Sequence, residues 1–359
     1  MLGCYVCCLA ALCFYTAAAL AGFYKEKISS EGGVDSLHPS SASGNYRSAL
    51  HSSAFLAFIR KYGRRYKAGS LMFQERYQIF LKSIERQKYL NTTAFSANLT
   101  SAARYGINQF SDLSAEEFFN TYLRSFPTSN YTSNKPLKNS TQQYLLPLRF
   151  DWRDKNFVTP VKNQLSCGAC WAFSVVGAVE SAYAIKGHTL EELSVQQVID
   201  CSYLDSGCNG GSTDSALKWL NQTKTKLVRA SEYNFKAQTG FCHYFPKTDF
   251  GVSINGYKTQ DFSGGEESMM KKLIHLGPLV VIVNAISWQD YLGGIIQHHC
   301  SSGTPNHAVL VTGYDKTGDT PYWIVKNSWG TSWGADGYVF IKMGGNICGI
   351  ADFVAVPLM

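Results

Sequence analysis

One cysteine stands where a nucleophile of acyl transfer could be expected. Cys170 ends the run Gln164-Leu165-Ser166-Cys167-Gly168-Ala169-Cys170, and the apolar run Trp171-Ala172-Phe173-Ser174 follows it. That pattern predicts the start of a buried helix. A thiolate is the attacking form of cysteine, and both a helix start and a neighbouring histidine lower the pKa of a thiol. Cys170 is therefore a candidate nucleophile that needs a basic partner.

Two later segments contain suitable partners. His307 lies at the edge of an apolar strand pattern, where its imidazole could face a cleft, although a histidine in such a place is more often structural. Asn327 could offer a neutral amide oxygen to the imidazole N–H, and Trp329 could shield that bond from water. The Gln164 side chain and the Cys170 backbone N–H are candidate donors to an oxyanion.

The remaining cysteines indicate an oxidising compartment. Four of the 11 cysteines lie in the apolar residues 1–21, which end in small residues and predict a cleaved secretory signal peptide. A membrane anchor is the alternative, because this apolar run is long for a signal peptide and its start carries no Lys or Arg. Cleavage would leave Cys167, Cys170, Cys201, Cys208, Cys242, Cys300 and Cys348. Six of these can pair and one stays free, but the count does not say which one.

The net charge of +7 belongs to one part of the chain. Residues 22–145 carry 16 Lys and Arg against 8 Asp and Glu, which gives +8, whereas residues 146–359 carry 17 against 18, which gives −1. The carboxy-terminal part therefore lacks the charge of a polyanion-binding protein, and we expect no nucleic-acid partner.

The part before residue 145 has two low-complexity stretches and two helical patterns. Ser29–Ser48 is too polar to pack and is expected to be mobile. Aromatic residues at three- and four-residue steps predict helices around residues 55–66 and 73–89, which would form a small hairpin with its own core. The stretch 127–143 predicts an exposed linker, and we place the main domain boundary near residue 145.

After this boundary, helical patterns come before strand patterns. Helices are predicted over residues 171–185, 194–201 and 212–220, and strands over residues 280–283, 307–312, 322–325 and 338–343. This order predicts an α+β fold in two halves, with a groove between them as the natural site.

From Leu146 onward the chain resembles the papain-type cysteine proteases. Gln164, Cys170, His307 and Asn327 occur in the family's order, and the runs Asp151-Trp152-Arg153, Cys208-Asn209-Gly210-Gly211 and Asn327-Ser328-Trp329-Gly330-Thr331-Ser332-Trp333-Gly334 agree with it. The resemblance implies a papain-like two-domain fold, with a helical half, a β-barrel-like half and a catalytic cleft between them. It also implies a cysteine endopeptidase that forms an acyl-enzyme and needs no metal or other cofactor.

The same resemblance assigns further residues. It implies disulfides between Cys167 and Cys208, Cys201 and Cys242, and Cys300 and Cys348, with Cys170 left free. The implied substrate-binding residues are Gly210, Gly211, Thr213, Ile282, Pro305, Asn306, Trp329 and Phe353. Of these, Thr213, Ile282, Pro305 and Phe353 would form a pocket for an apolar substrate residue, which the bulk of Phe353 could make shallow. Three runs, 171–183, 288–300 and 348–352, resemble one branch of the family in particular.

The segment before residue 145 resembles the family's inhibitory propeptide. The pattern G-x-N-x-F-x-D in residues 106–112 carries the resemblance. The family's long-helix pattern is degraded: Arg76, Phe80 and Asn91 fit it, whereas Met72, Ser83 and Gln87 stand where Glu, Asn and Ile are expected. We therefore expect a signal peptide over 1–21, an inhibitory propeptide over 22–145 and a catalytic domain over 146–359.

Alternative functions remain for three features. Cys167 and Cys170 form C-x-x-C, which could be a redox dithiol or half of a zinc site, but a βαβ pattern and a second ligand pair are not seen. His298 and His299 could suggest a metal site or an exopeptidase loop, and a polar strand end is the simpler interpretation. An inactive, binding-only homologue is the third alternative, although all four chemical positions are filled.

Compartment and partners follow from the resemblance and from sequons. The sequons Asn91, Asn98, Asn130, Asn139 and Asn221 fit a secretory route. The resemblance implies residence in the lysosome, with secretion as the alternative. The expected partners are protein and peptide substrates, the chain's own propeptide and cystatin-type inhibitors, and we expect a monomer. The basic propeptide suggests that acid loosens it by protonating the carboxylates that hold it.

Overall fold

The computed structural model describes residues 41–96, 101–128, 145–244, 249–300 and 303–359. The chain forms two compact units, residues 1–54 and 55–359, and of the first unit only residues 41–54 are described. The predicted signal peptide lies outside the described residues. No described helix is both long enough and apolar enough to span a bilayer.

Helices dominate the amino-terminal segment, of which residues 41–96 and 101–128 are described. Its elements are α2 (Ser41–Lys61), α3 (Leu71–Ser96), β1 (Arg104–Tyr105) and α4 (Ala115–Tyr122). The predicted hairpin core is confirmed, because the ring of Phe55 lies 5.2 to 5.3 Å from the rings of Phe73, Tyr77 and Phe80. Helix α2 begins at Ser41, inside the stretch Ser29–Ser48 that was expected to be mobile. No proline follows Pro39 in that stretch, so nothing there stops a helix.

Three helices build one half of the carboxy-terminal domain, residues 145–359. They are α5 (Cys170–Ile185), α6 (Val195–Cys201) and α7 (Thr213–Thr223), as the helical patterns predict. Ser194 caps α6 by accepting the N–H of Gln197 at 3.0 Å. Helix α5 is apolar on nearly every side and almost wholly buried. Gly177 allows this helix close to the sheet, because a Cβ there would come within 3.3 Å of Leu310.

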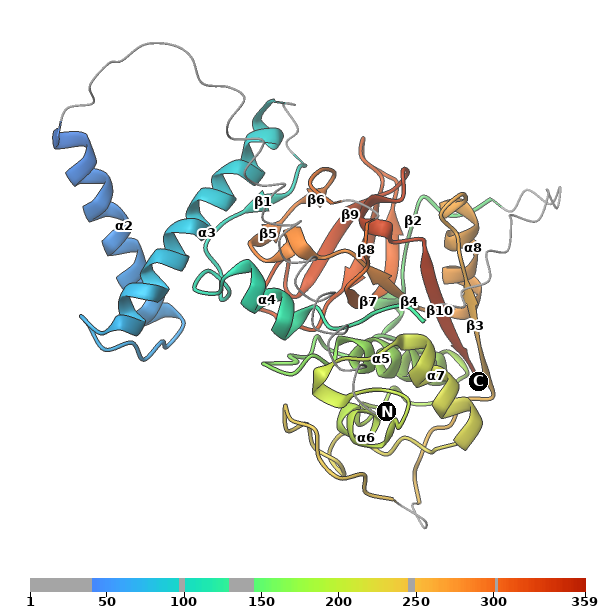
Figure 1. Ribbon diagram of the computed structural model, residues 1–359. Coiled ribbons are helices and arrows are strands. Elements are labelled where there is room, and N and C mark those ends of the chain that lie inside the picture. Colours follow the sequence, from blue (N-terminus) through green and yellow to red (C-terminus); the bar gives the residue numbers. More distant parts are fainter. Residues whose placement is uncertain (1–40, 97–100, 129–144, 245–248, 301–302) are drawn as a thin grey trace, which may run out of the picture. The chain divides into compact units, whose positions relative to one another are not determined.

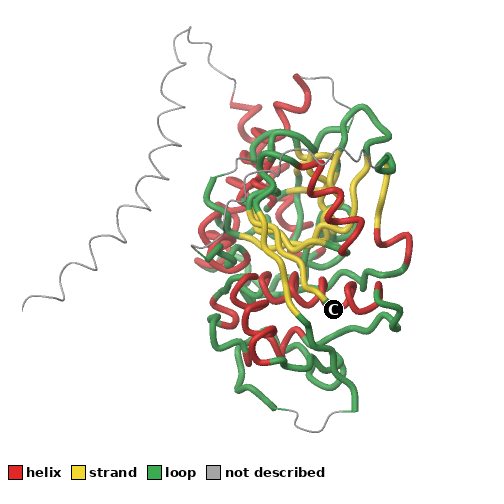
Figure 2. The backbone as a smooth tube through the Cα atoms, turned by 90° about the vertical axis from the view of Figure 1, so that its right-hand side faces the viewer, coloured by secondary structure: helices red, strands yellow, loops and turns green. Residues whose placement is uncertain are grey.

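An eight-stranded sheet builds the other half. Its strand order is β3-β10-β4-β7-β8-β9-β6, and β2 also pairs with β7. The strands are β2 (Arg149–Asp151), β3 (Gly256–Gln260), β4 (Leu279–Val283), β6 (Ile295–Ile296), β7 (His307–Asp315), β8 (Tyr322–Lys326), β9 (Tyr338–Lys342) and β10 (Phe353–Leu358). In Figure 1, helices α5 to α7 gather on one side and the strands on the other, and Figure 2 shows the strands together in yellow.

Six further elements complete this domain. They are η1 (Trp152–Lys155), η2 (Gly207–Asn209), α8 (Glu266–Leu276), η3 (Ile286–Trp288), β5 (Tyr291–Gly293) and η4 (Ile347–Gly349). The four predicted strands are confirmed as β4, β7, β8 and β9. Strands β3 and β10 were not predicted, because β3 is only half-buried and β10 contains Pro357. The helical half and the sheet half each have a hydrophobic core of their own.

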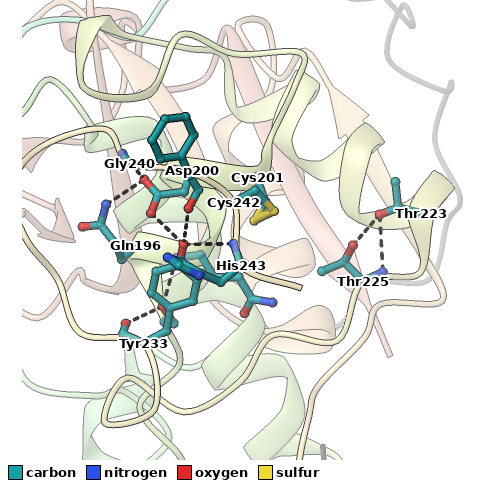
Figure 3. Close-up of a disulfide and its surroundings, with 12 residues drawn as sticks. Gln196, Asp200, Cys201, Thr223, Thr225, Tyr233, Gly240, Cys242 and His243 are labelled. Atoms are coloured by element: carbon teal, nitrogen blue, oxygen red, sulfur yellow. Dashed lines mark hydrogen bonds between the residues drawn. A yellow bond between two sulfur atoms is a disulfide. The ribbon is translucent and has the colours of Figure 1, made fainter. Parts of the chain in front are cut away.

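Three disulfides staple the domain, and they are the pairs that the resemblance implies: Cys167–Cys208, Cys201–Cys242 and Cys300–Cys348. Around the second pair, the hydroxyl of Tyr233 donates to the carboxylate of Asp200 at 2.7 Å, and that carboxylate accepts the N–H of Gly240 at 2.7 Å (Figure 3). Cys170 is the one free cysteine among the described residues.

Candidate active site

Cys170 is the first residue of α5 and is fully buried. Burial raises the pKa of its thiol, while the backbone N–H groups of Ala308 and Arg124 face the sulfur and oppose that rise. Because Ala308 directly follows His307, the thiol of the helical half lies beside the histidine of the sheet half. The predicted nucleophile and base are therefore brought together although 136 residues of sequence lie between them.

His307 is held by Asn327. The imidazole Nε2 lies 2.8 Å from Oδ1 of Asn327, and that oxygen also accepts the backbone N–H of Ser328 at 2.8 Å. The second bond fixes the orientation of the amide, so Nε2 must carry the proton of the neutral ring and Nδ1 stays free as a base. Among the described residues, Nδ1 has no hydrogen-bond partner.

The sheet register explains this pair. Strands β7 and β8 are antiparallel neighbours, with Leu310 opposite Lys326. His307 begins β7 and Asn327 follows the end of β8, so both stand at the same edge of the sheet. Trp329 covers the pair, because its ring stacks on the imidazole at 4.6 Å and is itself fully buried. The predicted shield of the His307–Asn327 bond is thus in place.

Gln164 lies at the same site. It is fully buried, its Oε1 accepts the hydroxyl of Ser328 at 2.6 Å, and its Nε2 donates to the carbonyl of Cys167 at 2.9 Å. A side-chain amide has two N–H donors, so one remains for an oxyanion next to Cys170.

A charged network joins the two halves beneath Asn327. Nζ of Lys326 donates to the carbonyl of Thr159 at 2.7 Å, the hydroxyl of Thr159 donates to Glu180 at 2.6 Å, and Lys162 pairs with Glu180 at 2.8 Å. Burial lowers the pKa of Lys326 to about 8. Glu180 belongs to α5 and Lys326 to β8, so this network fixes the helix of the nucleophile to the strand that leads to Asn327.

A strand from the amino-terminal segment runs over this site. The N–H of Ser125 donates to the carbonyl of Asn306 at 3.0 Å, and the N–H of Gly211 donates to the carbonyl of Arg124 at 3.0 Å. Ser125 and Gly211 form a parallel bridge. Gly210 has φ +119°, and a Cβ there would lie 2.5 Å from the carbonyl oxygen of Arg124, so glycine is required for this approach.

Comparisons with known proteins agree with this geometry. Residues 146–358 match the model described as "Papain family cysteine protease", which covers more than half of the chain. This chain belongs to the papain family of cysteine proteases. Residues 55–118 match the "Cathepsin propeptide inhibitor domain (I29)". The chain is therefore a cysteine protease with an inhibitory propeptide, and the strand in the cleft follows the part that matches the inhibitor model.

Individual relatives support the same assignment. Cathepsin O of Homo sapiens is 64% identical over 276 residues, which are 77% of this chain and 85% of that protein. Cathepsin O of Mus musculus is 57% identical over 278 residues, or 76% and 87% of the two chains. The digestive procathepsin L2 proteinase from Tenebrio molitor larval midgut has a TM-score of 0.76 at 32% identity and covers 86% of this chain and 100% of its own. The resemblance of three runs to one branch, cathepsin O, is confirmed, as is the papain-like α+β fold.

Burial shifts the pKa values of both Cys170 and His307 in this structure. Burial lowers the pKa of His307 to about 4, and Asn327 and the carbonyl of Tyr122 only partly oppose this. Burial in the closed chain therefore disfavours both the imidazolium form of His307 and the thiolate form of Cys170.

The predicted substrate-binding residues fall into two groups. Gly211 and Asn306 form backbone hydrogen bonds with the strand around Ser125, and Trp329 covers His307 and Asn327. For the predicted apolar pocket, the structure places Ile282 opposite Phe353 in the β4–β10 pairing. Thr213 is buried at the start of α7, and Pro305 directly precedes Asn306.

Three aromatic residues and one glutamine of the amino-terminal segment contact Trp329, and the sequence did not predict these contacts. The rings of Phe110, Phe118 and Tyr122 lie 5.5, 5.2 and 6.2 Å from its ring. Gln109 Nε2 donates to the backbone carbonyl of Trp329 at 2.9 Å. Phe110 was visible as part of the propeptide pattern, but no local signal marks Phe118 or Tyr122 as partners of a residue some 200 positions away.

The alternative interpretations of the cysteine and histidine motifs gain no support. Cys167 is paired with Cys208 and is not available as a redox or zinc partner of Cys170. In the part of the chain that the structure describes, no three His, Cys, Asp or Glu side chains gather as a metal site would require. His298 and His299 follow β6, and the ring of His299 lies 5.2 Å from that of Tyr89 in α3.

Two of the five sequons can be placed. Asn91 is half-buried, and its side chain bonds both backbone groups of Tyr105, at 2.8 and 3.0 Å, so it is a poorly accessible acceptor. Asn221 is also half-buried and accepts from Lys224 at 3.0 Å. Asn98, Asn130 and Asn139 lie outside the described residues.

Proposed function

We propose that this protein is the zymogen of a cysteine endopeptidase in which Cys170 and His307 form the catalytic pair. The observation that carries the proposal is the hydrogen bond from His307 Nε2 to Asn327, because it directs Nδ1 away from Asn327 and leaves it free beside the Cys170 helix. The family match supports the reaction class.

The mechanism follows from these positions. Once the propeptide leaves, solvation of the site restores the basicity of His307, and Nδ1 takes the proton of the Cys170 thiol. The thiolate attacks the peptide carbonyl, and the oxyanion accepts the Cys170 N–H and the second Gln164 N–H. The imidazolium then protonates the leaving amine as the C–N bond breaks. Water, deprotonated by His307, hydrolyses the acyl-enzyme and regenerates the thiol.

The zymogen arrangement is proposed with the boundaries expected from the sequence. Residues 1–21 would be a signal peptide, 22–145 the propeptide and 146–359 the catalytic domain. Cleavage before residue 146 would free the strand that lies over Cys170. The similarity to cathepsin O supports the secretory pathway and the lysosome as its location, with secretion as the alternative. We propose a monomer that cystatin-type inhibitors can bind.

The proposed substrate pocket is shallow and apolar. Ile282 and Phe353 face each other across β4 and β10 and, with Thr213 and Pro305, would receive an apolar side chain two residues before the cleaved bond. A peptide library that shows a preference for charged residues at this position would contradict this pocket.

An activity-based probe tests the catalytic assignment. The purified chain, reduced and matured at acid pH, is treated with a tagged epoxysuccinyl probe, and the label is located by mass spectrometry. We expect label on Cys170, none in Cys170→Ala, and strongly reduced label in His307→Ala, with folding of both variants checked by circular dichroism. If the matured wild-type protein takes no label, the chain is a binding-only homologue.

A further inference from the structure

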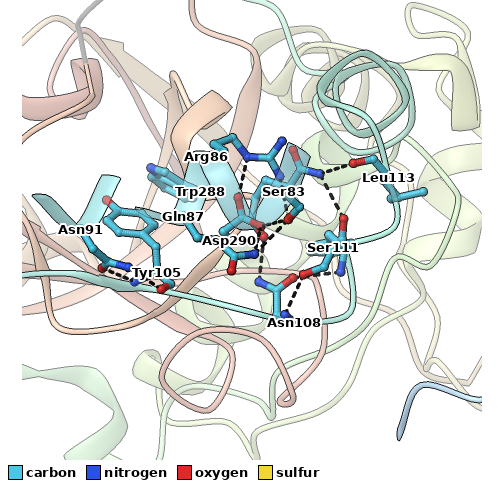
Figure 4. Close-up of polar contacts among 12 residues, drawn as sticks. Ser83, Arg86, Gln87, Asn91, Tyr105, Asn108, Ser111, Leu113, Trp288 and Asp290 are labelled. Atoms are coloured by element: carbon cyan, nitrogen blue, oxygen red, sulfur yellow. Dashed lines mark hydrogen bonds and ion pairs between the residues drawn. The ribbon is translucent and has the colours of Figure 1, made fainter. Parts of the chain in front are cut away.

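One carboxylate of the catalytic domain is buried beneath the propeptide. Asp290 lies between η3 and β5 and is fully buried. Its Oδ1 accepts from the Ser83 hydroxyl at 3.0 Å and from Gln87 Nε2 at 3.1 Å, and its Oδ2 accepts from Arg86 Nε at 2.5 Å (Figure 4). In the described part of the chain, every side-chain partner of Asp290 therefore comes from α3 of the propeptide.

The three partners act as one unit. Ser83, Arg86 and Gln87 stand at positions i, i+3 and i+4, which share one face of a helix. Gln87 Nε2 also donates to the Ser83 hydroxyl at 2.9 Å, and Arg86 Nη2 lies 3.3 Å from the same oxygen. Ser83 and Gln87 are two of the positions at which this chain departs from the long-helix pattern of its family. Here these departures are matched to a carboxylate on the opposite surface.

Because Asp290 is buried, its carboxylate needs both a cationic partner and hydrogen-bond donors from α3. Trp288 and Tyr291 beside it are fully buried, and the Arg86 side chain is about one-fifth exposed. A buried carboxylate that loses its cationic partner is left uncompensated in an apolar environment, which strongly disfavours the closed form. A helix without the arginine, or without the two neutral donors, would leave part of the carboxylate unsatisfied.

We infer that Asp290 is the residue by which the catalytic domain recognises its own propeptide. Asp290, between Trp288 and Tyr291, forms a socket with a single carboxylate for a helix that presents serine, arginine and glutamine at i, i+3 and i+4. This socket is distinct from the cleft at Cys170, where the propeptide strand is held by backbone hydrogen bonds. The inference rests on the proposed inhibition by the propeptide and assigns its selectivity to Asp290.

A double-mutant cycle in the full-length zymogen tests the pairing. The rate at which an epoxysuccinyl probe labels Cys170 at neutral pH reports the fraction of molecules in which the propeptide has opened. We expect Asp290→Asn and Arg86→Gln each to speed labelling about tenfold or more. The double variant should be no faster than the faster single variant, because both changes remove the same ion pair.

Two further variants sharpen the test. Gln87→Ile, which restores the residue of the family pattern, should speed labelling by about threefold, because it removes one donor from a buried acceptor. Lys88→Gln removes a positive charge from the same helix at an exposed position and should leave the rate unchanged. An equal effect of Lys88→Gln and Arg86→Gln would reduce the result to general charge attraction and would overturn the inference.

Other outcomes are equally decisive. Single variants that label at the wild-type rate, or effects that multiply in the double variant, would overturn the role of Asp290. After maturation, Asp290→Asn should cleave a small peptide substrate as well as the wild type does, and a loss of turnover would mean that Asp290 supports the catalytic domain itself. A wild-type zymogen that labels as fast as the matured enzyme would instead contradict propeptide inhibition, whatever Asp290 does.

Discussion

The propeptide contacts the catalytic domain in two different ways. Over the cleft, the strand around Ser125 is held by backbone hydrogen bonds to Gly211 and Asn306. Beside the cleft, α3 and α4 are held by side chains, with rings packed on Trp329 and polar groups gathered on Asp290. Backbone hydrogen bonds can form with many different side chains in the strand, whereas buried side-chain contacts tolerate few substitutions. We therefore expect that the backbone of the strand around Ser125 is enough to block the cleft, whereas the side chains of α3 and α4 determine which propeptide is recognised.

This contrast predicts that substitutions of the buried side chains packed on Trp329 cause the largest losses in stability of the closed zymogen. Phe110 is buried against Trp329, Phe118 and Tyr122, so Phe110→Ala should weaken the closed zymogen by about 3–5 kcal/mol. Phe126, which is 40% exposed at the end of the cleft strand, provides the matched control. Phe126→Ala should cost about 1 kcal/mol or less. Thermal unfolding and the rate of Cys170 labelling measure both, and equal effects would remove the distinction between the regions.

A second prediction concerns the carboxylate inside the helical region. Asp112 is buried and accepts from Arg64 at 3.0 Å and from the hydroxyl of Tyr66 at 2.5 Å. Asp112→Asn should destabilise the propeptide by about 3 kcal/mol, because it leaves Arg64 without its charge partner. Calorimetry of the full chain would show this as a lower unfolding temperature. If the temperature stays unchanged while labelling of Cys170 accelerates, Asp112 acts on docking and not on folding of the propeptide.

We expect His307 to contribute most to the loss of stability of the closed zymogen at acid pH. Its pKa in the closed zymogen is about 4 because of burial, against an ordinary value of 6.5, so the open form binds a proton more readily. Between pH 6.5 and 4, the closed form therefore loses stability as the pH falls, by about 1.4 kcal/mol for each pH unit fully inside that window. Above pH 6.5 this contribution is constant.

A variant without His307 lacks the base that activates Cys170, so labelling of Cys170 cannot report how its closed form opens with pH. Limited proteolysis of the linker near residue 145 measures this opening instead. Cleavage by an added protease should accelerate between pH 6.5 and 4 in the Cys170→Ala chain. The same chain with His307→Gln should show a flatter profile. An unchanged profile would assign the acid response to other groups, such as the carboxylates of the helical region.

The smallest effects are expected from side chains of the cleft strand. The Ser125 hydroxyl is buried and has no hydrogen-bond partner among the described residues, so Ser125→Ala should change stability by less than about 0.5 kcal/mol. Ser125→Pro removes the N–H that bonds Asn306 and should cost about 1–3 kcal/mol. Comparing Cys170 labelling in the two variants separates backbone from side chain at one position. A larger effect from alanine than from proline would refute backbone control of the cleft.

Part of the site could be predicted from local patterns. Cys170 stands before a run of small and apolar residues, and that run becomes the buried helix α5. Ser194 and Gln197 predict a helix start, and their bond is formed. The apolar run after His307 becomes β7, and its pairing with β8 places Asn327 against the imidazole. Strands β3 and β10 escaped prediction, because they pair with each other across some 100 residues and carry weak local patterns.

The sequence by itself determined the residues on which the proposed chemistry depends: a candidate nucleophilic thiol, a candidate base, a residue that could orient this base, and an odd cysteine count that leaves one thiol free. These features depend on residue type and on short-range periodicity, which a chain carries before it folds. Only the tertiary structure decided how the amino-terminal segment contacts the domain that contains Cys170 and His307. Ser83 and Asp290 are 207 positions apart in the sequence, and Ser125 and Gly211 are 86 positions apart. Such contacts form because two surfaces bury each other's polar groups, and no local pattern in either segment specifies its partner.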